Sequence, residues 1–244
     1  MKRRDVLRGL SFLPFGASVL PIQSVSANPK IPAGKGPLVP GAEIFQSIGV
    51  EPLINCMGTF TIIGGSLERP AVRAAMEAAS RNFVQYDELA AGIGKRLAEL
   101  TGAEWGMVSA GCAAGLKHIT AACVTGGNPE KLIRIPDLAG FDKTEVVIPR
   151  SSRNEYDHAI RNIGVKVITV ETLEEFGNAL NSRTAMVYVM ADNKEPLSLQ
   201  AIVRLTQPRN IPVLVDAAAE DLTVPCVHLQ QGATIVAYSG GKAL

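Results

Sequence analysis

The chain has 244 residues, of which 47% are hydrophobic and 19% are charged, a composition typical of a globular protein with one large core or two modest ones. Its formal net charge is +1, and the first 27 residues carry a net +3, so the remainder is slightly acidic at −2. This balance argues against nucleic acid as a partner, because such binding depends on an excess of Lys and Arg. The four cysteines form no CxxC pair and have no histidine at metal-ligand spacing, so no metal site is predicted.

Residues 1–27 have the layout of an export signal. The paired Arg3-Arg4 precedes an apolar stretch with no charge from Ser11 to Ala27, and Val25-Ser26-Ala27 offers a small-residue cleavage site. The arginine pair resembles that of a twin-arginine signal, which predicts a periplasmic or otherwise exported protein. A leader that stays uncleaved would instead anchor the protein to the membrane. Residues 28–40, rich in Pro, Gly and Lys, are predicted to be a linker.

From residue 41 onward, helix-like and strand-like runs alternate. Periodicity and end signals predict helices over 70–80, 87–100, 112–124, 155–163, 173–180 and 199–206. Short apolar runs predict strands over 105–109, 145–148, 165–170, 184–190, 211–216 and 234–238. Continuous apolar strands separated by helices indicate an α/β fold, a three-layer αβα sandwich with a mainly parallel sheet. In such a fold the functional loops follow the carboxyl ends of the strands.

Three features fall at those expected strand ends. The segment Ser109-Ala-Gly-Cys-Ala-Ala114 turns from a strand into a helix, and its free N–H groups suit a phosphate, although a plain steric turn would look the same. Asp216 ends an apolar run, where it could pair with a protonated pyridine nitrogen or cap a helix. Lys242 follows the last strand in Ser239-Gly-Gly-Lys242, where its amine could hold pyridoxal phosphate (PLP) as a Schiff base. The order of the three predicts a PLP site.

These motifs resemble the selenocysteine synthase-like branch of fold-type I PLP enzymes, as do Leu53-Ile-Asn-Cys-Met-Gly-Thr59, residues 100–104 and residues 153–159. That branch contains bacterial L-seryl-tRNA(Sec) selenium transferases and D-glucosaminate-6-phosphate ammonia-lyase-like proteins. The ammonia-lyase-like side is closer, because the charge is near neutral, a leader is present and no tRNA-binding N-terminal domain is recognisable. The resemblance implies that residues 41–244 form an incomplete large domain of aspartate aminotransferase-like architecture.

The same resemblance implies a PLP-dependent lyase or transferase that acts on an amino acid or amino sugar acid by α-deprotonation and β-elimination. Lys242 would carry the cofactor and move protons, and Asp216 would pair with the pyridine nitrogen. The resemblance also implies two further sets of contacts. The cofactor phosphate would be held by Gly111, Cys112 and Ser239, and the substrate would be contacted by Asn55, Thr59 and Arg153. For Arg153, an ordinary surface arginine is the alternative.

Two departures from the family pattern stand out. Ser152 occupies a position where the family often has a histidine that stacks on the cofactor, and the chain ends just after Lys242, where the family continues with a strand and a small C-terminal domain. Without that strand an open sheet edge is expected, so we expect the 244 residues alone to fold poorly and show little turnover. A homo-oligomer is implied for a full-length protein. The rival interpretations are a selenium transferase and a truncated, non-catalytic exported protein.

Overall fold

The computed structural model describes residues 40–242, and the chain divides into two units between Ile54 and Asn55. Residues 40–54 of the first unit contain one short 3-10 helix, η1 (Gln46–Ile48). The predicted signal peptide, 1–27, and all but the last residue of the predicted linker, 28–40, lie outside the described residues. Within residues 40–242 no helix is long and apolar enough to span a membrane.

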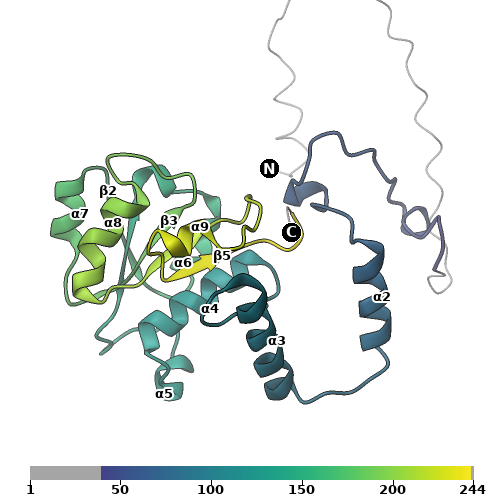
Figure 1. The fold of residues 1–244 in the computed structure, drawn as a ribbon, viewed down its shortest axis with the longest axis horizontal. Coiled ribbons are helices and arrows are strands. Elements are labelled where there is room, and N and C mark those ends of the chain that lie inside the picture. Colours follow the sequence, from purple (N-terminus) through teal and green to yellow (C-terminus); the bar gives the residue numbers. More distant parts are fainter. Residues whose placement is uncertain (1–39, 243–244) are drawn as a thin grey trace, which may run out of the picture. The chain divides into compact units, whose positions relative to one another are not determined.

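The second unit, described from Asn55 to Lys242, alternates helices and strands along the chain (Figure 1). Its longer helices are α2 (Pro70–Ala79), α3 (Tyr86–Thr101), α4 (Cys112–Thr125), α7 (Leu173–Ala179) and α8 (Leu199–Thr206). Its short helical turns are η2 (Thr61–Ile63), α5 (Pro129–Leu132), η3 (Arg150–Ser152), η4 (Glu155–Asp157), α6 (His158–Arg161), η5 (Gln207–Arg209) and α9 (Val227–Gln230). The predicted helices at 70–80, 87–100, 112–124, 173–180 and 199–206 are confirmed to within two residues at each end.

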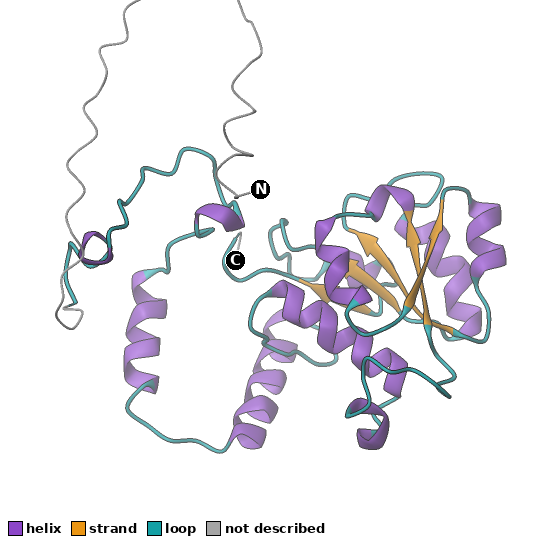
Figure 2. Cartoon of the chain, turned by 180° about the vertical axis from the view of Figure 1, so that it is seen from behind, coloured by secondary structure: helices purple, strands orange, loops and turns teal. Residues whose placement is uncertain are grey.

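Five parallel strands form one sheet in the order β2-β1-β3-β4-β5. Figure 2 shows the strands of this sheet with helices beside them. They are β1 (Glu145–Pro149), β2 (Lys166–Val170), β3 (Thr184–Met190), β4 (Val213–Asp216) and β5 (Ile235–Ala237). Met190, Asp216 and Ala237 are paired in register across β3, β4 and β5. These three residues therefore lie side by side at the carboxyl edge of the sheet, where the sequence predicts the functional loops.

Two apolar clusters cover the two faces of the sheet. On one face, Leu116 of α4 and Ile160 of α6 pack with Val146 and Ile148 of β1. On the other, Phe176 of α7 and Ile202 of α8 pack with a separate set that includes Val187 and Val215. Side chains alternate between the faces along each strand, so strands covered on both sides must be apolar throughout. The predicted three-layer αβα sandwich is confirmed.

The predicted strand at 105–109 is wrong. This segment has no strand pairing, and its large apolar side chains Trp105, Met107 and Val108 are exposed. A strand exists only where a neighbour accepts its ladder of hydrogen bonds, and in the described part of the chain no strand offers one to this segment. The helix predicted over 155–163 is also shorter than expected, because it divides into η4 and α6 before Gly164, whose φ is 91°.

Candidate active site

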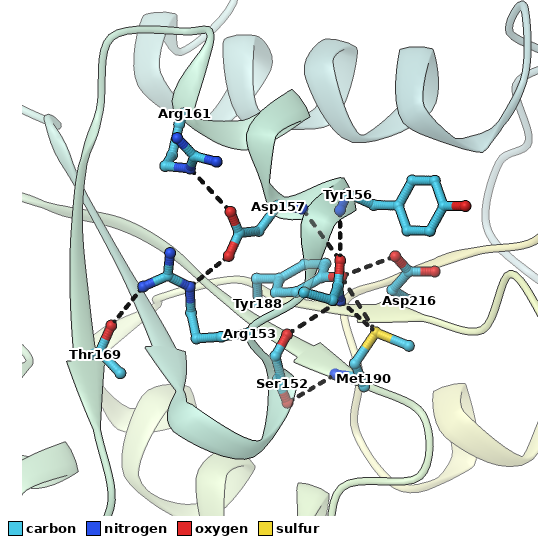
Figure 3. A network of polar contacts seen from close by, with 10 residues as sticks. Ser152, Arg153, Tyr156, Asp157, Arg161, Thr169, Tyr188, Met190 and Asp216 are labelled. Atoms are coloured by element: carbon cyan, nitrogen blue, oxygen red, sulfur yellow. Dashed lines mark hydrogen bonds and ion pairs between the residues drawn. The ribbon is translucent and has the colours of Figure 1, made fainter. Parts of the chain in front are cut away.

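Asp216 belongs to a polar network at the carboxyl edge of the sheet (Figure 3). The residue is only 4% exposed, and its two carboxylate oxygens have different partners. Oδ2 accepts a hydrogen bond of 2.9 Å from the Tyr188 hydroxyl. Oδ1 accepts from the Ala218 N–H at 3.1 Å and lies 3.8 Å from the Cys112 sulfur. A buried charge needs such donors, so β3, α4 and the loop after β4 together orient this carboxylate.

Tyr188 and Asn154 extend the cluster away from Asp216. Tyr188 is completely buried, and its hydroxyl oxygen lies 3.2 Å from Asn154 Nδ2. Asn154 also caps η4, since its Oδ1 accepts from the N–H groups of Tyr156 at 2.8 Å and Asp157 at 3.2 Å. Burial and the nearby Asp216 charge raise the pKa of the Tyr188 phenol well above its usual value. Tyr188 therefore keeps its proton at neutral pH.

Cys112 is the first residue of α4, and its side chain is directed at Asp216. Burial, followed by the Asp216 charge, raises the pKa of the thiol to about 12, although the Lys242 charge acts in the opposite direction. Cys112 is therefore a neutral thiol at physiological pH. The phosphate contact implied for Cys112 stays a prediction, and the structure assigns its sulfur a different neighbour.

The N-terminus of α4 has the backbone geometry of an anion-binding site. Gly111 is the N-cap residue with φ of 90°, a conformation that favours glycine, and no side chain caps the helix. Among the described residues, the N–H groups of Cys112, Ala113 and Ala114 have no hydrogen-bond acceptor. Free N–H groups at the positive end of a helix of 14 residues suit a phosphate.

Lys242 and Ser239 lie in the turn after β5. The Lys242 N–H donates to the Ser239 carbonyl at 3.1 Å, which closes the turn. Lys242 Nζ lies 5.9 Å from the centre of the Tyr156 ring and forms no ion pair within residues 40–242. Both Lys242 and Ser239 are half-buried. The Lys242 amine thus lies beside η4. The N-cap residue of η4, Asn154, contacts Tyr188, which in turn contacts Asp216. Lys242 and Asp216 are therefore at the same edge of the sheet.

Arg153 is already engaged by its own chain. Its Nε donates to Asp157, and its Nη1 donates to Thr169 Oγ1 at 2.8 Å (Figure 3). Arg161 donates to the other oxygen of the same carboxylate at 2.9 Å. Burial by itself would raise the pKa of Asp157, but the hydrogen bonds and charges of the two arginines outweigh it and hold this pKa below its usual value. A substrate role for Arg153 stays a prediction.

Ser152 fills its position as a structural residue. Its hydroxyl is completely buried and accepts from the Met190 N–H at 3.0 Å, at the point where β3 ends. The hydroxyl also lies 3.3 Å from Asn193 Oδ1. Ser152 therefore satisfies a backbone donor at the sheet edge.

Asn55 and Thr59, predicted near the substrate, are exposed in the structure. Asn55 forms a local turn, in which Nδ2 donates to the Gly58 carbonyl at 2.8 Å and Oδ1 accepts from the Met57 N–H at 2.9 Å. Within residues 40–242 neither Asn55 nor Thr59 has a polar contact with Asp216 or Lys242. Their predicted role is untested.

Sequence reasoning missed Tyr188 and Asn154. One available signal was a hydroxyl-bearing aromatic residue inside an otherwise aliphatic strand, Thr184–Met190, since a buried phenol needs a polar partner. The second signal was Asn154 just before the short run Glu155–Asp157, which is a helix-cap pattern. Neither signal identifies Asp216 as the partner.

Comparisons with known proteins give this geometry a family context. No protein-family model matches the chain. Over 213 residues the chain is 33% identical to D-glucosaminate-6-phosphate ammonia lyase of Salmonella typhimurium. The aligned region covers 82% of this chain and 57% of that protein. Over 215 residues it is 32% identical to 5'-C-glycyluridine monooxygenase-decarboxylase of a Streptomyces species, covering 82% and 53% respectively. A solved structure of a D-glucosaminate-6-phosphate ammonia-lyase superposes with a TM-score of 0.76 at 31% identity, covering 82% and 57%.

The chain is homologous to the D-glucosaminate-6-phosphate ammonia-lyases. The cofactor of this family is PLP. The chain spans a little over half the length of the two curated relatives. The residues fit the cofactor, since a free amine, a fixed carboxylate and unpaired helix N–H groups match its aldehyde, ring nitrogen and phosphate.

Proposed function

We propose that this protein is a PLP-dependent lyase that releases ammonia from an amino acid or amino sugar acid by α-deprotonation and β-elimination. The observation that carries the proposal is that Lys242 and Asp216 lie at one edge of the sheet, joined by the contacts of Tyr156, Asn154 and Tyr188. The Salmonella typhimurium relative, an ammonia lyase by name, supports the type of reaction.

The chain's own residues have distinct tasks in this proposal. When bound, PLP supplies an electron sink for negative charge at the substrate's α carbon. Lys242 Nζ holds the cofactor and moves the α proton, and the Asp216 carboxylate accepts a hydrogen bond from the ring nitrogen. The N–H groups at the start of α4 bind the phosphate, with Gly111 in the conformation that exposes them.

A second candidate is oxidative decarboxylation. It is favoured by the Streptomyces relative, which is called a monooxygenase-decarboxylase and is 32% identical over a similar span. Decarboxylation and deamination differ in the bond of the substrate that breaks at the α carbon. A comparison of released products therefore separates the two candidates.

The test uses the protein purified from its natural host, loaded with PLP and mixed with amino sugar acids and with amino acids that carry a β-leaving group. We expect ammonia and a keto acid in equal amounts, without carbon dioxide or oxygen consumption. Lys242→Ala should abolish the release, whereas Lys117→Ala, which removes an exposed lysine on α4, should leave it unchanged. Carbon dioxide with oxygen uptake would favour the second candidate, and equal ammonia from Lys242→Ala would refute the role of Lys242.

A further inference from the structure

The hydrogen bonds around Asn154 determine which way its side-chain amide faces. Oδ1 accepts from two backbone N–H groups, those of Tyr156 and Asp157, which only an oxygen can do. Nδ2 is therefore the atom that faces Tyr188, at 3.2 Å, and it also donates to the Ser152 carbonyl at 3.2 Å. The Met190 sulfur also lies 3.2 Å from Nδ2. A thioether is only a weak acceptor, so the two amide hydrogens go to the Ser152 carbonyl and the Tyr188 oxygen.

This orientation also fixes the proton of Tyr188. The phenol oxygen accepts from Asn154 Nδ2, and its single hydrogen has two acceptors in reach, Asp216 Oδ2 at 2.9 Å and the Met190 sulfur at 3.3 Å. The hydrogen points to Asp216, because a charged carboxylate at the shorter distance is a far stronger acceptor than a thioether. The raised pKa of Tyr188, caused by burial and by the Asp216 charge, keeps that hydrogen in place. Asn154, Tyr188 and Asp216 form a one-way chain of donors that ends on the carboxylate.

The register of the sheet explains why Tyr188 reaches Asp216. Tyr188 pairs with Leu214, two residues before Asp216 on the neighbouring strand, and side chains two residues apart share a face. Two residues of strand advance by about 6.6 Å, which is close to the length of a tyrosine side chain. The phenol therefore runs along the sheet from the level of Leu214 to that of Asp216.

We propose that Tyr188, held by Asn154, is a positioning residue that keeps the Asp216 carboxylate aimed at the ring nitrogen of the cofactor. The inference rests on the proposed function, in which Asp216 accepts that nitrogen's hydrogen bond. The Tyr188 donor occupies Oδ2, the Ala218 N–H occupies Oδ1, and together they leave the carboxylate little freedom to rotate.

Tyr188→Phe tests this role, because it keeps the buried ring and removes only the hydroxyl. We expect the dissociation constant for PLP to rise about tenfold, because an Asp216 carboxylate that Tyr188 no longer holds must be ordered again when the cofactor binds. We also expect the absorbance of the bound cofactor to change at a higher pH than in the unchanged protein. When the cofactor ring carries less positive charge, the Lys242 nitrogen bonded to it keeps its proton up to a higher pH. Thermal unfolding of the cofactor-free variant checks that the fold is intact.

Two further variants separate positioning from packing. Tyr238→Phe removes a hydroxyl that lies 3.3 Å from the Cys226 sulfur, so its PLP affinity should stay within about twofold of the unchanged protein. Asn154→Asp keeps an oxygen that caps η4 but replaces the donor with an acceptor, which competes for the Tyr188 proton. Asn154→Asp should therefore shift the absorbance transition in the same direction as Tyr188→Phe.

The outcomes distinguish this proposal from the proposed function. Unchanged affinity and transition pH in Tyr188→Phe, or an equal change in Tyr238→Phe, would overturn the positioning role while PLP binding stands. If the unchanged protein binds no PLP at Lys242, the proposed function fails, and alkylation of Cys112 in the cofactor-free protein then decides only whether Tyr188 orients the Asp216 carboxylate. Tyr188→Phe should change that rate about threefold, because a carboxylate released at Oδ2 can rotate about its remaining Ala218 contact and alter the distance from Oδ1 to the thiol. An unchanged rate would overturn the proposal there as well.

Discussion

The Cys112 thiol reports directly on the charge of Asp216. Its pKa of about 12 has burial as its largest cause and the Asp216 carboxylate as the next. Most of the reactive thiolate is therefore absent at pH 8 to 9, and removing the carboxylate charge should increase it. Each unit by which the pKa falls gives about ten times more thiolate in this range.

We expect Asp216→Asn to speed alkylation of Cys112 at pH 9 by about threefold or more in the cofactor-free protein. Peptide mass spectrometry of iodoacetamide-treated protein measures the rate. Cys123 is the internal control, because burial alone raises its pKa to about 11 and Asp216 does not contribute. Equal rates at Cys112 in the two proteins would mean that the contact with Asp216 is absent.

At the scale of elements, the segment between β1 and β2 is held by one buried carboxylate. Asp157, whose side chain is 2% exposed, joins η4 to Arg153 and Arg161. Since its folded pKa is lowered, its stabilisation is present above the unfolded pKa of about 3.9 and is lost as the pH falls through the folded value.

Asp157→Asn should lower the free energy of unfolding by about 2 kcal/mol at pH 7, because two arginines lose a buried partner. Below about pH 4 the difference in the free energy of unfolding between the two proteins should shrink, since Asp157 of the unchanged protein becomes protonated. Urea unfolding at several pH values measures both effects. Asp142→Asn is the control, because the Asp142 carboxylate that pairs with Lys131 is 85% exposed. A gap between the two proteins that stays constant down to pH 3 would contradict this account.

The elements that the sequence predicts well are those whose signal is local. Buried strands such as Thr184–Met190 are continuous apolar runs, and helices such as Tyr86–Thr101 have apolar residues at helical spacing. Residues 105–109 look equally strand-like, but pairing depends on a neighbouring strand that no local pattern reveals. The chain of donors from Asn154 to Asp216 was missed for the same reason, because it joins residues far apart in sequence.

The sequence predicts that Asp216 and Lys242 lie at one edge of the sheet, because the carboxyl ends of parallel strands share an edge, and the structure confirms this shared position. The position of the Cys112 side chain was not predictable in this way. The turn motif predicts the path of the backbone, but the direction of the sulfur depends on how α4 packs on the sheet. The sequence predicts a substrate contact or an ordinary surface position for Arg153, and neither interpretation reveals that it donates to Asp157 and Thr169.

At the scale of the whole molecule, exposed apolar side chains are concentrated before the sheet begins. They include Val72 and Met76 on α2, together with Phe60, Phe83, Trp105 and Met107. Exposed apolar surface of this extent is typical of a region that contacts a partner. We propose that a second copy of the protein is the partner, in line with the oligomer that the family resemblance implies.

Val72→Glu combined with Met76→Glu tests this proposal, because the two residues are four apart and share one face of α2. Light scattering coupled to size-exclusion chromatography should show a dimer or larger for the unchanged protein and a smaller species for the double variant. Ala74→Glu with Ala78→Glu places the same charges on the opposite face of the helix and should leave the size unchanged. A monomeric unchanged protein would refute the proposal.

The central claim is that the Lys242 amine carries the cofactor opposite Asp216. Its most direct test is to mix the protein with PLP, reduce it with borohydride and map the modified peptide by mass spectrometry. The account predicts a phosphopyridoxyl group on Lys242, with much lower occupancy in Asp216→Asn at limiting PLP. Labelling of other lysines alone, or none at all, would contradict it.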